Sequence, residues 1–113
     1  MSQSQLIHAE LLRRYSTWFL PIGPIEKLAS NGLSGMEIWR YRSSAGRLAI
    51  RCWPANGPSR EQILVIHQWL REAAQRCSTH LPVPTASTNG ETLHEIHQRF
   101  WEITPWLEGN AEA

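Results

Sequence analysis

The chain has 113 residues, a length that fits one domain and excludes most multi-domain enzymes. Charged residues make up 19% of it, against roughly 25% in an ordinary soluble domain; all ten acids are Glu, and ten of the eleven bases are Arg. With no Asp, the chain excludes a Ser-His-Asp triad, a paired-Asp site and an EF-hand, and its net charge of +1 gives no general attraction to nucleic acid or anionic lipid.

The first predicted element is a helix over residues 6–19. Apolar side chains recur there at intervals of three and four, as in a helix with one buried face: Leu6, Ile7, Leu11, Tyr15, Trp18 and Phe19. Pro21 and Gly23 then end it. No apolar run approaches the ~18 residues of a membrane span, and residues 1–5 lack a signal-peptide layout. We therefore expect a cytoplasmic protein with no membrane partner.

Two antiparallel strands follow, over residues 37–42 and 48–53. Both segments are rich in aromatic and β-branched residues, and residues 43–46 (Ser-Ser-Ala-Gly) join them as a hairpin. Because successive side chains of a strand point to opposite faces, Ala49, Arg51 and Trp53 should share one face. The other face should carry Leu48, Ile50 and Cys52.

A long helix is predicted over residues 59–77. Ser59 and Gln62 form a capping box at its start. Its apolar stripe consists of Ile63, Ile66, His67, Leu70, Ala73, Ala74 and Cys77. After an extended connection at residues 81–84, two more hairpin-linked strands are predicted, with residues 88–90 (Thr-Asn-Gly) as the turn and residues 100–104 as the final strand.

The cysteines and histidines indicate no site of their own. Cys52 and Cys77 lie far apart without framework spacing, so we expect buried reduced thiols rather than a disulfide. His94 and His97 form an H-x-x-H whose rings would point to opposite faces, which disfavours a metal site. His67 is interpreted as a partly buried packing residue of the long helix.

Aromatic and basic residues alternate on the first hairpin, and they have two interpretations. They could form a stacking surface for single-stranded nucleic acid, or they could be sheet packing with solvated arginines. The near-neutral net charge favours the second interpretation. The residues are Trp39, Arg40, Tyr41, Arg42, Arg47, Arg51 and Trp53.

Two segments resemble parts of a phosphate-binding site. Residues 31–35 (Asn-Gly-Leu-Ser-Gly) could present backbone N–H groups to a phosphate, although an ordinary turn would look the same. Residues 48–51 (Leu-Ala-Ile-Arg) have the layout of the V-A-I-K strand of kinases, with the small and the basic residue on one face. Ala49 would leave room for a flat base and Arg51 would reach phosphates, unless Arg51 is a plain surface residue.

Taken in order, these segments resemble the amino-terminal lobe of the aminoglycoside phosphotransferase and choline kinase-like family, over about residues 11–109. The resemblance is carried by Asn-Gly-Leu-Ser-Gly (31–35), Ile-Trp-Arg (38–40), Arg-Cys-Trp-Pro (51–54), Ile-His-Gln-Trp-Leu (66–70), Val-Pro (83–84) and Trp-Glu-Ile-Thr-Pro-Trp-Leu-Glu-Gly (101–109). It implies an α+β kinase-like small lobe with about five antiparallel strands and one long packed helix, 59–77. The implied domains are an amino-terminal helix (1–20), the lobe (21–109) and a tail (110–113).

The resemblance also implies an ATP site under the sheet. Gly32, Ser34 and Gly35 would cover the phosphates, Ala49 would border the adenine, and Arg51 would take the place of the anchoring Lys. The helix carboxylate that pairs with this base would be Glu61, although Glu61 comes earlier than the family pattern and Ile63 matches the position better. The hinge backbone from Thr104 to Leu107 would bind the adenine edge; since Pro105 has no N–H, the donor would be Trp106 or Leu107.

The catalytic and magnesium-binding Asp residues of this family lie in a carboxy-terminal lobe, and no Asp occurs here. We expect Glu95, Glu102 and Glu108 to be solvated rather than catalytic. The resulting prediction is an ATP-binding lobe of an aminoglycoside phosphotransferase-like small-molecule kinase, incomplete and inactive alone, with magnesium only if a catalytic lobe is supplied. The alternative is a non-catalytic module that keeps the lobe fold and binds a protein through the face around Ala49, Trp53 and Trp106.

Overall fold

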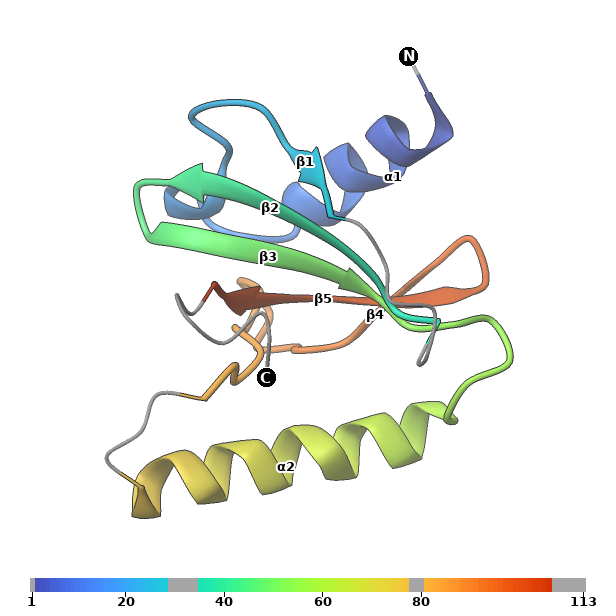
Figure 1. Cartoon of the computed structure of the whole chain (residues 1–113), viewed down its shortest axis with the longest axis vertical. Coiled ribbons are helices and arrows are strands. Elements are labelled where there is room, and N and C mark those ends of the chain that lie inside the picture. The colour runs from blue at the N-terminus through green and yellow to red at the C-terminus, as the bar shows by residue number, and fades with distance from the viewer. Residues whose placement is uncertain (1, 29–34, 78–80, 107–113) are drawn as a thin grey trace.

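A computed structural model describes residues 2–28, 35–77 and 81–106. Its centre is a five-stranded antiparallel sheet of order β1-β2-β3-β5-β4, with helix α1 on one face and helix α2 on the other (Figure 1). The elements are α1 Gln3–Leu12, the 3-10 helix η1 Thr17–Phe19, β1 Glu26–Lys27, β2 Glu37–Ser43, β3 Gly46–Cys52, α2 Arg60–Arg76, β4 His94–Ile96 and β5 Arg99–Pro105. The predicted α+β architecture, with five antiparallel strands, a long helix and an amino-terminal helix, is therefore confirmed.

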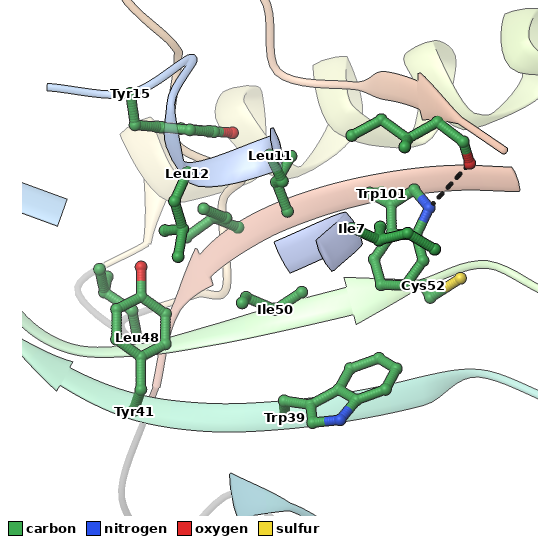
Figure 2. Packing of buried hydrophobic residues seen from close by; sticks show 12 residues of the cluster. Ile7, Leu11, Leu12, Tyr15, Trp39, Tyr41, Leu48, Ile50, Cys52 and Trp101 are labelled. Atoms are coloured by element: carbon green, nitrogen blue, oxygen red, sulfur yellow. Dashed lines mark hydrogen bonds between the residues drawn. The ribbon is translucent and has the colours of Figure 1, made fainter. Parts of the chain in front are cut away.

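The main core lies between α1 and the sheet face that α1 covers (Figure 2). Leu11 of α1, Ile50 of β3 and Ile103 of β5 have no exposed surface. Burial of such apolar area is the dominant favourable contribution to folding. The full cluster is Ile7, Leu11, Leu12, Tyr15, Trp39, Tyr41, Leu48, Ile50, Cys52, Ile96, Trp101 and Ile103.

The first hairpin forms as predicted. β2 and β3 pair antiparallel, and the two-residue turn Ser44-Ala45 joins them. The Ser43 hydroxyl accepts from the Ala45 N–H at 3.1 Å and donates to the Gly46 carbonyl at 2.9 Å. Gly46 has φ +110°, a value that L side chains rarely adopt, so a glycine suits this end of the turn.

The amino-terminal helix is shorter than predicted: α1 ends at Leu12 rather than running to residue 19. Its last turn tightens, with Arg14 N–H bonded to Leu11 O and Tyr15 N–H to Leu12 O, both at 3.1 Å. The Arg14 carbonyl then accepts from the Thr88 N–H at 3.0 Å, a tertiary contact that replaces the next helical bond. The apolar spacing continues through η1, which explains why sequence periodicity predicted one helix.

The predicted position of the turn in the last hairpin, residues 88–90, is also wrong. Residues 88–90 do form a turn, but the turn between β4 and β5 is His97-Gln98. Both residues have positive φ, 53° and 62°, the geometry of a type I′ turn. This turn lacks the Asn-Gly or Asp-Gly signal that normally predicts it, whereas Asn89-Gly90 carries that signal in a different loop.

Helix α2 begins and ends close to the predicted bounds. Ser59 and Gln62 form the predicted capping box, with bonds of 3.2 and 2.8 Å. Only Ile63 and His67 of the helix are buried. Cys52 is a buried free thiol as expected, but Cys77 is exposed, because it follows the last turn of α2 and leaves the packed face. No helix in the described part of the chain is long and apolar enough to cross a membrane.

Candidate functional site

The sheet face opposite the main core brings together three of the predicted site residues. Ala49 of β3 lies directly across from Arg40 of β2 and from Thr104 of β5. Arg51, two residues further along β3, lies across from Glu102. Because directly paired residues of antiparallel strands share a face, Ala49, Arg51 and Thr104 form one continuous surface. Helix α2 lies over the same face (Figure 1).

Two aromatic residues of the first hairpin, Trp39 and Tyr41, do not belong to this surface. Trp39 and Tyr41 are buried in the core on the other face, at 5% and 3% exposure. Arg40 and Arg42 are exposed on the candidate face. The side chains of Trp39 and Tyr41 therefore belong to the packing of the sheet, as the second interpretation predicted. They are not available to stack on nucleic-acid bases.

Arg51 lies beside a buried carboxylate. Its Nε is 3.9 Å from Glu102 Oε2, close enough for an ion pair and too far for a hydrogen bond. That Nε is buried and has no hydrogen-bond partner within the described residues. The side chain as a whole is 26% exposed, so part of it remains accessible to a ligand.

Glu102 is buried, which corrects the expectation that it is solvated. Its residue exposure is 1%, and Oε1 accepts from Trp53 Nε1 and from His67 Nε2, each at 2.7 Å. His67 is itself fully buried, with Nδ1 2.9 Å from the Thr92 hydroxyl, so it is more than a packing residue. Buried polar groups need such partners, and this network supplies them from β5, α2, the residue after β3 and the loop before β4.

Sequence reasoning missed this network, although part of its signal was present. His67 lies on the apolar stripe of the long helix, and a polar residue at such a position implies a buried hydrogen-bond partner. The partner, Glu102, follows only from the β3–β5 register, which places it across from Arg51. That register cannot be read from either strand alone.

The other predicted site residues are more scattered. Glu61 is exposed in the first turn of α2, whereas Ile63 is fully buried. Gly35 is exposed with φ +71°, and a Cβ there would lie 3.2 Å from Pro54 Cβ, so a larger residue would be strained. The predictions for Gly32 and Ser34 fall outside the described residues.

Trp106 lies at the end of β5 and is half-buried. Its backbone N–H donates to Arg47 O at 2.9 Å, so this N–H is already occupied. Of the two backbone N–H donors predicted for the adenine edge, the other is that of Leu107, and Leu107 lies outside the described residues. The Trp106 ring lies 5.9 Å from the Arg40 guanidinium carbon, a cation–π contact.

A pocket of about 380 Å³ opens beside the Arg40–Trp106 contact. Its lining residues are Gly23, Pro24, Glu26, Arg40, Tyr41, Arg42, Arg47 and Trp106. Three arginines and one indole make it suited to an anionic or flat ligand. Glu26 partly offsets that charge, since its Oε1 lies 3.4 Å from Arg40 Nε. Trp106 is the one predicted site residue in this lining.

Two further kinds of chemistry, at a metal ion and at the buried Cys52 thiol, can be compared with the described residues. No group of three or more His, Cys, Asp or Glu side chains in residues 2–28, 35–77 and 81–106 could hold a metal ion. Burial raises the pKa of the Cys52 thiol to about 11, which keeps it protonated and unreactive near neutral pH.

One of the comparisons with known proteins, that with solved structures, found a similar fold. No family model matches the chain, and no curated protein matches it. Among solved structures, the chain is similar to amicoumacin kinase hAmiN in complex with AMP-PNP, Ca²⁺ and Ami, with a TM-score of 0.74 and 16% sequence identity. The match covers 96% of this chain and 32% of that chain. The chain therefore shares the fold of about a third of that kinase, as expected for a kinase-like small lobe.

Proposed function

We propose that this chain is the nucleotide-binding lobe of an aminoglycoside phosphotransferase-like small-molecule kinase. The observation that carries the proposal is the joint placement of Ala49, Arg51 and Thr104 on one sheet face, in a fold similar to that of a kinase solved with AMP-PNP. ATP would lie along this face. Its phosphates would reach Arg51, and its base would lie toward Ala49 and the end of β5.

Arg51 would anchor the phosphates through its guanidinium. An arginine carries a fixed charge and a planar set of donors that match phosphate oxygens. The accessible part of the side chain makes this contact possible, and the buried Glu102 beside it limits where the guanidinium can lie.

The base would need a small rearrangement to reach Ala49, which is 2% exposed. Arg40 is the exposed residue directly across from Ala49, and its guanidinium already contacts the Trp106 ring. We expect Arg40 to move aside or to stack on the base, because a guanidinium plane stacks readily on aromatic rings.

Phosphoryl transfer would require groups outside these 113 residues. Transfer from ATP depends on carboxylates that hold magnesium and on a base for the acceptor hydroxyl, and no Asp is present here. A second lobe would supply them and would cover the candidate face. By itself the chain should bind ATP without turning it over.

The direct test is calorimetric titration of ATP, with and without magnesium, into the whole 113-residue chain. Arg51→Ala should weaken ATP binding about 10- to 100-fold, since a hydrogen bond to a charged group contributes about 1.5–3 kcal/mol. The matched control is Arg71→Ala, which removes an exposed arginine of α2 and should leave the affinity unchanged.

Two outcomes would contradict the proposal. If wild-type chain binds no ATP and instead self-associates or captures a protein partner, the interaction-module alternative is favoured. If purified wild-type chain hydrolyses ATP and Arg51→Ala abolishes this, the lobe is catalytic without a second lobe.

A further inference from the structure

We infer that Glu102 is the positioning residue that holds Arg51 in place for the nucleotide phosphates. Glu102 would thus do from strand β5 what the family resemblance assigned to Glu61 on the long helix. The inference rests on the proposed function, because it concerns how Arg51 is presented to its ligand.

The sheet itself places the two side chains together. Arg51 and Glu102 are directly paired across β3 and β5 and share a face, so their proximity depends on strand register and not on the placement of a helix. Arg51 Nε lies 3.9 Å from Glu102 Oε2. The candidate helix carboxylate, Glu61, is exposed at the start of α2.

The two carboxylate oxygens of Glu102 have different neighbours. Oε1 accepts from both Trp53 and His67 at 2.7 Å, and the Thr92 hydroxyl in turn contacts His67. These bonds restrain the carboxylate and leave Oε2 facing Arg51. Glu102 is therefore held from one side and presented to Arg51 on the other.

Burial distinguishes Glu102 from the other described carboxylates. Glu102 is the only buried carboxylate in the described part of the chain, and its side chain is 2% exposed. A buried charge is retained in a fold only when it is paired and hydrogen-bonded. Arg51 Nε is also buried and lacks a hydrogen bond to any described residue. A movement of Arg51 Nε by roughly 1 Å toward Glu102 Oε2 would turn the ion pair into a hydrogen bond. Contacts of this kind in a binding site often tighten only when the ligand binds.

The test compares ATP with adenosine, which lacks phosphates, in calorimetric titrations of the whole chain. In Glu102→Gln, ATP binding should weaken about 5- to 30-fold while adenosine binding stays unchanged. The double variant Arg51→Ala/Glu102→Gln should bind ATP no more weakly than Arg51→Ala alone, because Glu102 would act only through Arg51. A purely structural role would weaken both ligands and add to the Arg51→Ala effect.

A second measurement needs no nucleotide. In ¹⁵N NMR spectra, the Arg51 Nε–H signal should show restricted motion in wild type and averaged motion in Glu102→Gln. Glu95→Gln, which changes an exposed carboxylate of β4, should alter neither the NMR signal nor ATP binding. If Glu102→Gln fails to fold, Trp53→Phe removes one donor to Glu102 and should give a smaller loss in the same direction.

The outcomes separate this inference from the proposed function. ATP binding that depends on Arg51 but is unchanged or stronger in Glu102→Gln overturns the inference and leaves the proposed function standing. Absence of ATP binding by folded wild-type chain overturns the proposed function, and the inference with it.

Discussion

At the scale of single residues, His8 and His94 are buried on the core side of the sheet and contact aromatic rings. The His8 ring lies 4.6 Å from that of Trp39, and its Nε2 has no hydrogen-bond partner among the described residues. His94 Nε2 lies 3.1 Å from the Tyr15 hydroxyl. Burial lowers the pKa of both histidines, and Arg14 lowers that of His94 further. Both rings are therefore held in the neutral form.

These histidines should make the protein less stable in mild acid. Well above pH 6.5 both are neutral in the folded and the unfolded chain, so they contribute no pH dependence there. Below that pH the unfolded chain binds protons that the folded chain resists. The free energy of unfolding should therefore fall by at most about 1.4 kcal/mol per pH unit for each histidine.

Urea denaturation between pH 7.5 and 5 measures this slope. His8→Phe keeps a ring in the core and removes one titrating group, so its slope should be shallower than that of wild type. A slope that is the same in wild type and His8→Phe would show that the pKa of His8 is the same in the folded and the unfolded chain.

At the scale of elements, the two helices are stabilised differently. Helix α1 contributes Ile7, Leu11 and Leu12 to the main core, whereas α2 buries only Ile63 and His67. A helix with so little buried surface depends more on its own ends. The Ser59 capping box satisfies backbone N–H groups that would otherwise lack partners.

Removing that cap should lower the stability of the whole chain. Ser59→Ala should lower the free energy of unfolding by about 1 kcal/mol, as measured by urea denaturation. Ser59→Asp keeps an oxygen acceptor and adds a favourable charge at the helix start, so it should match or exceed wild type. Equal stability of wild type and Ser59→Ala would mean that the first turn of α2 is not capped in solution.

At the scale of the whole molecule, the sheet separates two different environments. The face under α1 is apolar and forms the main core, whereas the face under α2 carries Arg51, Glu102 and the other candidate site groups. Helix α1 supplies part of that core, so it packs directly on the sheet.

The amino-terminal helix should therefore be needed for folding. Leu11→Ala removes a fully buried side chain and should lower the free energy of unfolding by about 2–5 kcal/mol. That is a large share of the ~5–15 kcal/mol typical of whole domains. Leu6→Ala, on the same helix but 56% exposed, should cost little. Equal effects of the two variants would place α1 outside the folded core.

Local features were the ones that sequence could predict. The β2–β3 hairpin, the bounds of α2 and the common face of Ala49 and Arg51 all follow from periodicity, turn residues and caps within a few positions. The order and spacing of these segments were enough to predict a kinase-like small lobe, which the structure confirms.

Features that depend on distant contacts required the tertiary structure. The end of α1 depends on a bond from Thr88, and the partner of Arg51 depends on the β3–β5 register. The last turn falls at His97-Gln98, whose positive φ values no local residue preference predicted. The sequence by itself determined that Ala49 and Arg51 of β3 share one face. Only the tertiary structure decided that Glu102 is buried beside Arg51, because register and packing between distant segments select among pairings that local preferences leave equal.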